Sequence, residues 1–248
     1  GDAEQLISGF AAFIKLTNPK GKLIIHQNAY EKVRNKEIGS SKIYQYGLNS
    51  GNIHADNIKV GTNSFSFDYV AEDQRIDGLV LEVPGFHNIE NALAAVAVAV
   101  HYGLSKEAII DGIATYKGVK RRFEKIYNSE RITYIDDYAH HPEEIKAFLQ
   151  SVKAMYPAKK ITAVFQPHLF TRTRDFASGF SESLSLADSV ILLDIYPARE
   201  QPIAGITSEM LLPKITSTNK WVVSKDELLS HLDQHTPEVL VTIGAGDI

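Results

Sequence analysis

The pattern of hydrophobic and polar residues divides the chain into two parts. In the first part, short runs rich in β-branched and aromatic residues alternate with polar turns, which is typical of strands. These predicted strands are Lys22 to His26, Lys42 to Gly47, Asn52 to Val60, Ser64 to Ala71 and Gly78 to Val83. In the fourth of them, Phe65, Phe67 and Tyr69 alternate on one face.

Helices are predicted before and after these strands, so the first part is mixed α/β. The earliest carries apolar residues at helical spacing, namely Leu6, Phe10, Phe13 and Ile14. Another runs from about His87 to Tyr102 and ends at Gly103. The next begins with Ser105 as its N-cap and closes near Tyr116.

From Phe123 onward, strands and helices alternate regularly. The predicted strands are Phe123 to Tyr127, Arg131 to Ile135, Ile161 to Phe165, Ser189 to Asp194 and Val239 to Ile243. This alternation predicts a Rossmann-like, mostly parallel sheet with helices on both faces. We therefore expect two domains, one of residues 1–116 and one of residues 117–248.

Composition excludes several classes of function. The chain of 248 residues has a net charge of −4 with its Lys and Arg spread out, which argues against nucleic acid. It has no cysteine, so disulfides and thiol chemistry are excluded. Its longest apolar run, Ala92 to Val100, is too short for a bilayer, and no secretory signal is visible at its start. We expect a cytoplasmic protein without a membrane partner. The oligomeric state cannot be read from the sequence, although an exposed sheet edge in residues 1–116 could pair with a second copy.

The segment Gly85 to Asn91 opens the Ala-rich helix and is the first candidate for a binding site. Asn88 and Asn91 are three residues apart, so both amides can face the same way, and an amide can pair with the N6 and N7 edge of adenine. Alternatively, His87 or Asn88 caps a buried helix. The spacing alone leaves both interpretations open.

The stretch Asp136 to Glu144 is the second candidate. Pro142 suits the first position of a helix, so the preceding residues form a turn between a strand and that helix. Two carboxylates, a phenol and two imidazoles then lie at the carboxyl edge of the sheet, where ligands gather in such folds. The neighbouring His140 and His141 point in different directions, so a shared metal ion is not expected.

The third candidate is Phe165 to Arg174, which follows the next strand. His168, Arg172 and Thr173 open a helix there and could hold a carboxylate or a phosphoryl oxygen. The alternative is a solvated helix start with Arg172 paired to a local acid. Two weaker signals are discounted: the pair His231 and His235, for which a solvated helix face is favoured, and the glycine-rich turn at 244–246.

Together these segments resemble the Mur ligases. The resemblance rests on six segments in the family's order: Gly85 to Ala95, Gly118 to Glu124, Asp136 to Pro142, Phe165 to Thr173, Asp194 to Ala198 and Gly244 to Asp247. It covers essentially the whole chain and is greatest for the member that adds L-alanine. Residues 1–116 would then be the remaining part of the family's central ATPase domain, and residues 117–248 its C-terminal domain.

The resemblance implies an ATP- and Mg²⁺-dependent reaction. ATP phosphorylates the lactyl carboxylate of UDP-N-acetylmuramate, and the amine of L-alanine attacks the acyl phosphate, as a step of peptidoglycan precursor synthesis. By the family pattern, His87, Asn88 and Asn91 contact adenine. Arg122 and Asp137 approach the ribose and phosphates.

The resemblance also implies a set of residues around the alanine. The side chains that line this part of the site would be Tyr138, His140, His168 and Arg172. Of these, Arg172 is the best candidate to bind the alanine carboxylate. Many family members have Arg where this chain has Leu169, so a second guanidinium contact is not expected.

The chain departs from the family in what it lacks. No phosphate loop of the form Gly-x-x-x-x-Gly-Lys-Ser/Thr occurs. In the family this loop, the metal-binding Glu and His, and the UDP-binding domain precede the point that matches Gly1. The chain also lacks an initiator Met, so we expect a fragment of a longer protein, without ligase activity alone.

Three other hypotheses remain. The whole protein could be a sister ligase that uses another amino acid or a murein peptide. It could instead be a nucleotide-binding module without chemistry. A purely structural α/β fragment requires the polar clusters to be exposed and scattered.

Overall fold

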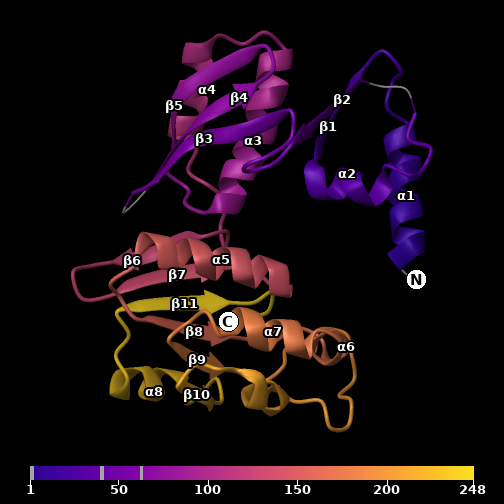
Figure 1. The fold of residues 1–248 in the computed structure, drawn as a ribbon. Coiled ribbons are helices and arrows are strands. Elements are labelled where there is room, and N and C mark those ends of the chain that lie inside the picture. The colour runs from indigo at the N-terminus through magenta and orange to yellow at the C-terminus, as the bar shows by residue number, and fades with distance from the viewer. Residues whose placement is uncertain (1–2, 40–41, 62–63) are drawn as a thin grey trace. The chain divides into compact units, whose positions relative to one another are not determined.

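The computed structural model describes residues 3–39, 42–61 and 64–248, and Figure 1 shows its elements. The chain forms two compact units, unit 1 (Gly1–Tyr116) and unit 2 (Lys117–Ile248). The elements of unit 1 are α1 (Ala3–Lys15), β1 (Lys22–His26), α2 (Gln27–Val33), β2 (Lys42–Tyr46), β3 (Ile53–Val60), β4 (Phe65–Ala71), β5 (Gln74–Leu81), α3 (Phe86–His101) and α4 (Lys106–Thr115).

The described strands of unit 1 form a mixed sheet in the order β1-β2-β3-β4-β5. β1, β2 and β3 are parallel, whereas β3, β4 and β5 are antiparallel. Phe65, Phe67 and Tyr69 are buried as their alternation predicted, because successive residues of a strand face opposite sides. The predicted N-cap is also confirmed, since the Ser105 hydroxyl accepts a hydrogen bond from the Ala108 N–H at 3.2 Å.

Unit 1 differs from the sequence prediction in several details. The helix α2 was not predicted. β5 begins at Gln74 rather than Gly78, because only two residues separate it from β4 in a tight hairpin. The helix at the start of the chain is present as α1, but its apolar stripe is mostly exposed. Ile14 is buried, whereas the side chains left exposed are Leu6, Phe10 and Phe13.

Unit 2 contains the second sheet. Its elements are β6 (Glu124–Asn128), β7 (Thr133–Asp137), α5 (Pro142–Met155), β8 (Ile161–Phe165), α6 (Phe170–Asp175), α7 (Ala177–Leu184), β9 (Ser189–Leu192), the 3₁₀ helix η1 (Ser208–Lys214), β10 (Asn219–Val222), α8 (Leu228–Gln234) and β11 (Val239–Ile243). The strand order is β10-β9-β8-β11-β7-β6, and every neighbouring pair is parallel except β6 with β7. The predicted mostly parallel sheet is confirmed.

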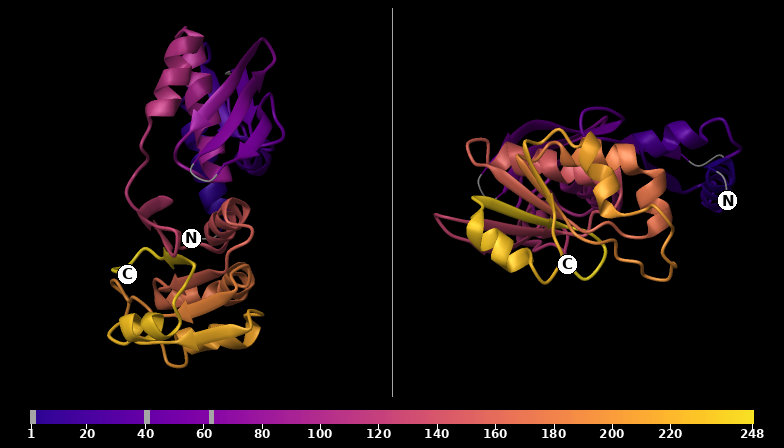
Figure 2. Two further views of the ribbon diagram at one scale, coloured as in Figure 1. Left: turned by 90° about the vertical axis from the view of Figure 1, so that its left-hand side faces the viewer. Right: turned by 90° about the horizontal axis from the view of Figure 1, so that it is seen from below.

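Helices cover both faces of this sheet, and Figure 2 shows unit 2 from two further directions. On one face, Phe165 of β8 packs against Phe180 of α7, with ring centroids 5.2 Å apart. On the other face, the preceding residue Val164 belongs to a cluster against which Leu228 and Leu232 of α8 pack. Alternate side chains of one strand therefore serve two separate layers of core.

Several strand predictions in unit 2 were wrong in detail. β9 ends at Leu192 rather than Asp194, and β6 is shifted by one residue. β10 was missed, because this edge strand begins with the polar residues Asn219 and Lys220. β7 ends at Asp137 rather than Ile135, so Asp136 and Asp137 are the last two residues of the strand and not part of the turn. Within the described ranges, every helix is too short or too polar to span a bilayer.

Candidate functional site

The polar turns of unit 2 meet at one edge of its sheet. Ile243 of β11 lies in register between Asp137 of β7 and Phe165 of β8. These three strands are parallel, so their carboxyl ends coincide and the segments that follow them start side by side. This edge places the second and third candidate segments next to each other.

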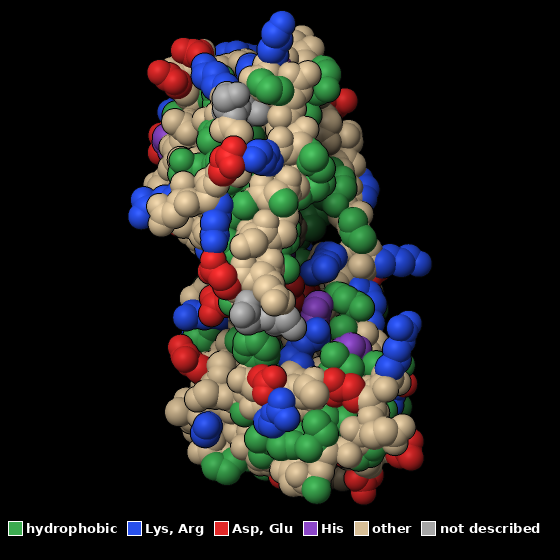
Figure 3. All heavy atoms as spheres, turned by 90° about the vertical axis from the view of Figure 1, so that its right-hand side faces the viewer, with side chains coloured by type: hydrophobic (Ala, Val, Ile, Leu, Met, Phe, Trp, Pro, Cys, Tyr) green, Lys and Arg blue, Asp and Glu red, His purple; other side chains and the backbone are tan. Residues whose placement is uncertain are grey.

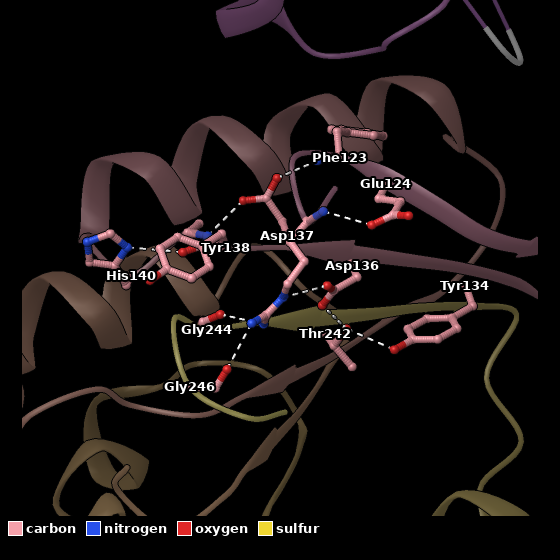
Figure 4. A network of polar contacts seen from close by, with 12 residues as sticks. Phe123, Glu124, Tyr134, Asp136, Asp137, Tyr138, His140, Thr242, Gly244 and Gly246 are labelled. Carbon is pink, nitrogen blue, oxygen red and sulfur yellow. Dashed lines mark hydrogen bonds and ion pairs between the residues drawn. The ribbon is translucent and has the colours of Figure 1, made fainter. Parts of the chain in front are cut away.

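Four of the candidate residues form a continuous row at this edge. The ring centroids of Tyr138 and His140 are 5.5 Å apart, and those of His140 and His168 are 6.5 Å apart. Nη1 of Arg172 lies 3.5 Å from Nδ1 of His168. Figure 4 shows the Tyr138 and His140 end of this row. The structure therefore brings together a phenol, two imidazoles and a guanidinium that come from two turns of the chain.

The two adjacent histidines have different neighbours, as predicted. His140 places Nδ1 3.0 Å from the carbonyl oxygen of Tyr138. His141 instead caps α5, where its Nδ1 accepts a hydrogen bond from the Glu143 N–H at 3.4 Å, with Pro142 at the start of the helix as predicted. Only His140 of the pair contacts His168.

His168 is held from two sides. Its ring stacks on Tyr196 at a centroid distance of 5.7 Å and an interplanar angle of 16°. Burial lowers the pKa of His168, and the positive charge of Arg172 and the nearby His140 lower it further. A neutral His168 can accept a hydrogen bond from Arg172 at Nδ1. Tyr196 lies in the segment Asp194 to Ala198, one of the six on which the resemblance rests, but the sequence assigned it no individual role.

The start of α6 fixes the surroundings of Arg172. Glu200 accepts hydrogen bonds from the hydroxyl and the backbone N–H of Thr171. These bonds lower the pKa of Glu200, and the charge of Arg172 contributes to the same effect. Thr173 does not face the edge of the sheet, because it is fully buried and its hydroxyl donates to the Leu169 carbonyl at 2.8 Å. Of the three candidates in this segment, Arg172 and His168 therefore contribute side chains to the row.

Asp137 is almost completely buried, and both of its carboxylate oxygens bind main-chain groups. They accept hydrogen bonds from the N–H of Phe123 at 2.7 Å and of Ala139 at 2.8 Å. Burial raises the pKa of Asp137 to about 6, against the opposing effect of these hydrogen bonds. Arg122 is exposed, with its guanidinium carbon 5.5 Å from the ring centroid of Tyr138. Arg122 therefore has more freedom to reach a ligand than Asp137.

Backbone strain surrounds the same edge. In unit 2, which the structure describes in full, four residues other than glycine have positive φ: Arg121 (57°), Phe123 (52°), Leu169 (73°) and Ala198 (50°). Such conformations cost free energy and persist where the surrounding structure enforces them, which is frequent at functional sites. Two of these residues flank Arg122, and a third follows His168.

In unit 1, the candidate residues lie at the start of α3. The helix begins after Gly85, which has φ of 121° and provides no side-chain cap, so neither His87 nor Asn88 is the N-cap. The amide of Asn88 donates instead to the Pro84 carbonyl at 2.8 Å, and the amide of Asn91 lies 3.5 Å from the Asn88 side-chain oxygen. The two amides share one face of the helix, as their spacing predicted.

A cavity of about 480 Å³ adjoins these amides. Its walls come mainly from small and apolar side chains of α3 and α4, including Ala92, Ile109 and Tyr116, while Asn88 and Asn91 supply polar groups. An apolar slot with a few hydrogen-bonding groups is the usual form of a site for a flat heterocycle. The cavity therefore combines apolar walls with two amides that can donate and accept hydrogen bonds.

The remaining histidine pair belongs to a packed aromatic cluster. His231 and His235 stack with ring centroids 4.5 Å apart, and both rings contact Trp221. The prediction of a solvated helix face is therefore only partly confirmed, because both rings also pack against Trp221. Throughout the described ranges, no group of three or more His, Cys, Asp and Glu side chains is arranged to hold a metal ion.

Charge is mixed over the face of the molecule drawn in Figure 3. On this face, acidic and basic side chains are interspersed, and in its lower part histidine side chains lie beside Lys and Arg.

The fold and the residues at the sheet edge define the class of protein: the chain belongs to the Mur ligase family. Residues 1–99 match the Mur ligase middle domain, and residues 121–246 match the Mur ligase glutamate ligase domain. The chain is 43% identical to the UDP-N-acetylmuramate–L-alanine ligase of Phocaeicola vulgatus over 249 residues, covering 100% of the chain and 54% of that protein. For the enzyme of the same name from Flavobacterium johnsoniae, the identity is 42%, covering 100% of the chain and 53% of that protein.

A solved structure agrees with this assignment. The UDP-N-acetylmuramate–alanine ligase of Thermotoga maritima matches with a TM-score of 0.69 and 27% identity, covering 89% of this chain and 51% of that one. The chain thus spans about half the length of the curated relatives it matches.

Proposed function

We propose that this chain is part of an ATP-dependent ligase that joins L-alanine to the lactyl carboxylate of UDP-N-acetylmuramate in the cytoplasm. The proposal is supported by the relatives of that name, and above all by the row of Tyr138, His140, His168 and Arg172 at the carboxyl edge of the unit 2 sheet. In the proposed reaction, ATP transfers its γ-phosphoryl group to the carboxylate with release of ADP. The amine of alanine then displaces phosphate to form the amide.

We assign nucleotide binding to residues of both units. The cavity beside Asn88 and Asn91 suits adenine, because its apolar walls can enclose the ring while the amides pair with its polar edge. His87, in the same turn of α3, is a further candidate for this contact. Arg122 is the group best able to neutralise phosphate charge, because it is exposed and its guanidinium makes no hydrogen bond to the described residues.

Asp137 has a second, indirect role in this proposal. Since its carboxylate oxygens already accept two backbone hydrogen bonds, it supports the turns on either side of Arg122 and Tyr138. The proposed contact of Asp137 with the ribose would be made in addition to these bonds. Mg²⁺ would supply further neutralisation of phosphate charge in the whole protein.

The alanine side is assigned to the imidazole and guanidinium groups of the row. Arg172 can bind a carboxylate in bidentate fashion, and His168 holds the guanidinium through Nδ1. Tyr138 and His140 line the approach to the same groups. This arrangement suits an amino acid that is held by its carboxylate with its amine free to react.

The test uses the complete polypeptide that contains this chain, assayed for ADP release with UDP-N-acetylmuramate, ATP and Mg²⁺ against a panel of amino acids. L-alanine is expected to give the highest kcat/KM. The variant Arg172→Ala is expected to raise KM for alanine about tenfold or more while KM for ATP stays near the wild-type value.

Two results would refute parts of this proposal. A clear preference for another amino acid or for a murein peptide would assign the protein to a sister activity. Ligation by purified chain 1–248 alone would contradict the expectation that the chain is inactive by itself.

A further inference from the structure

Arg121 lies at the centre of a polar network at the edge of the unit 2 sheet. Its Nε donates to Asp136 at 2.9 Å, its Nη1 to the Gly246 carbonyl at 2.8 Å and its Nη2 to the Gly244 carbonyl at 2.7 Å. In Figure 4, dashed lines mark these contacts at the labelled partners Asp136, Gly244 and Gly246. They join the start of unit 2 to the segment after β11. All three guanidinium nitrogens are therefore already used inside the protein.

The carboxylate partner of this guanidinium is itself well held. The Asp136 side chain is only 10% exposed, and its second oxygen accepts a hydrogen bond from the Thr242 hydroxyl at 2.6 Å. A shielded ion pair with further hydrogen bonds has a defined geometry. The Arg121 side chain therefore cannot rotate away without leaving the charge of Asp136 unpaired.

The backbone of Arg121 extends the network toward the proposed site. Its carbonyl accepts the N–H of Tyr138 at 2.7 Å, and its own N–H donates to Glu124 at 2.7 Å. The guanidinium carbon also lies 5.4 Å from the ring centroid of Tyr138. The position of Tyr138 thus depends on Arg121 through both its main chain and its ring.

Arg122 lies between two residues whose left-handed backbone is fixed by contacts. On one side, Arg121 is held by the bonds just described. On the other, Phe123 is buried against Phe148 at 5.1 Å between centroids and donates its N–H to Asp137. Arg122 itself is exposed. The two neighbours therefore determine the direction in which the Arg122 side chain leaves the surface.

The Gly244–Gly246 segment connects Arg121 to the other end of the site. A Cβ at Gly246 would overlap the side-chain oxygen of Gln166 and lie 2.9 Å from Cγ of Tyr196, so the segment packs closely on both. Tyr196 in turn stacks on His168. A shift of this segment would therefore displace Tyr196 and, through the stacked rings, His168.

We propose that Arg121 is a positioning residue that holds Arg122, Tyr138 and the Gly244–Gly246 segment in their working arrangement without contacting the substrates. The catalytic part of this inference rests on the proposed function, whereas the structural part does not.

The structural part is tested by hydrogen exchange on chain 1–248. Arg121→Ala is expected to speed exchange of the backbone amides at 244–247 and at Tyr138 by about tenfold or more, and Arg121→Lys by less. Arg131→Ala, an exposed arginine in the β6–β7 turn, serves as the matched control and should change neither segment. Unchanged exchange at 244–247 in both Arg121 variants would overturn the inference. Should Arg121→Ala fail to fold, Arg121→Lys decides.

The catalytic part is tested by kinetics of the complete polypeptide. Arg121→Ala is expected to lower kcat about tenfold or more with KM for ATP changed less than about threefold, and Arg121→Lys should recover part of kcat. Arg122→Ala should instead raise KM for ATP. A rise in KM for ATP as the main effect of Arg121→Ala would mean a direct contact and would overturn the assignment. Absence of ligase activity in the wild-type protein would refute the proposed function, while the exchange measurement would still decide the structural part.

Discussion

Each unit contains an arginine with three polar partners, and the two networks differ in what surrounds them. In unit 1, Arg75 bonds Asp56, Asp68 and Asp77, whose side chains are 52%, 11% and 70% exposed. These partners lie within 19 residues of Arg75 in the sequence. In unit 2, Arg121 bonds one shielded carboxylate and two carbonyls, the farthest 125 residues away.

The Arg75 network is local and lies at the surface, whereas the Arg121 network joins distant segments and is partly shielded from water. Exposed ion pairs gain little, because water screens the charges and the side chains lose freedom. A shielded arginine that joins distant segments leaves several groups without partners when it is removed. The same residue type should therefore contribute very differently in the two units.

The largest effect is expected for Arg121→Ala. Its removal leaves the Asp136 charge and two carbonyls without their donor, which should lower the free energy of unfolding of unit 2 by about 3 kcal/mol. Trp221, the only tryptophan of the chain, lies in β10 and reports this transition by fluorescence during urea denaturation. A loss below roughly 1 kcal/mol would show that the network is no stronger than a surface ion pair.

Each unit contains a buried aspartate, Asp137 in unit 2 and Asp68 in unit 1, and their pKa values are shifted in opposite directions. The pKa of Asp137 is raised to about 6 by burial, whereas hydrogen bonds from Gly78, Asn57 and Arg75 lower that of Asp68, the Gly78 N–H most. A raised folded-state pKa means that the stabilisation by protonation is complete below about pH 4 and lost as the pH rises through 6. Between pH 7 and pH 4, wild type should therefore gain about 2 to 3 kcal/mol of stability relative to Asp137→Asn.

The Asp68→Asn variant provides the opposite sign. Because the folded-state pKa of Asp68 is lowered, the advantage of wild type over Asp68→Asn should be constant from pH 7 to about pH 5 and shrink below it. Hydrogen exchange in β4 measures this in unit 1. Parallel pH profiles for the two aspartates would contradict the assigned environments.

The sheet of unit 2 could be predicted closely from the sequence, and the network of Arg121 could not. β8 and β11 match their predicted bounds because each is a short apolar run buried on both faces. By contrast, Arg121 and Arg122 are identical adjacent residues, and only the positive φ of Arg121 and its distant carbonyl partners direct one inward and the other outward. No local pattern encodes such a choice.

The candidate sites, too, could be predicted from the sequence only in part. The amide pair in α3 and the residues after β7 and β8 follow from helical spacing and from the rule for parallel sheets. The stacking of Tyr196 on His168 and the apolar walls of the cavity beside Asn91 depend on packing between separate elements, so they appear only in the folded chain.

A smaller effect is expected for glycine replacements. Gly246→Ala places a Cβ against Gln166 and Tyr196 and should destabilise unit 2 by about 2 kcal/mol, since overpacking forces neighbours to move. In unit 1, a Cβ added at Gly112 of α4 would meet no neighbouring atom within 4 Å, so Gly112→Ala should stabilise the helix by about 0.5 to 1 kcal/mol. Urea denaturation followed by circular dichroism measures the stability of both variants. If Gly246→Ala does not destabilise the protein, the segment around Gly246 can relax to accept the added methyl group.

The smallest effect is expected for Arg75→Ala. Arg75 is exposed, and two of its three carboxylates remain hydrated after its removal, so only Asp68 loses a shielded contact. Asp68 also keeps the hydrogen bonds from Asn57 at 2.7 Å and from the Gly78 N–H at 2.8 Å. The midpoint of unit 1 unfolding should therefore shift little at low salt and not measurably at high salt, where exposed charges are screened. A shift as large as that of Arg121→Ala, or one that salt leaves unchanged, would mean that the unit 1 network also acts as an internal support, because screening removes only interactions that water already reaches.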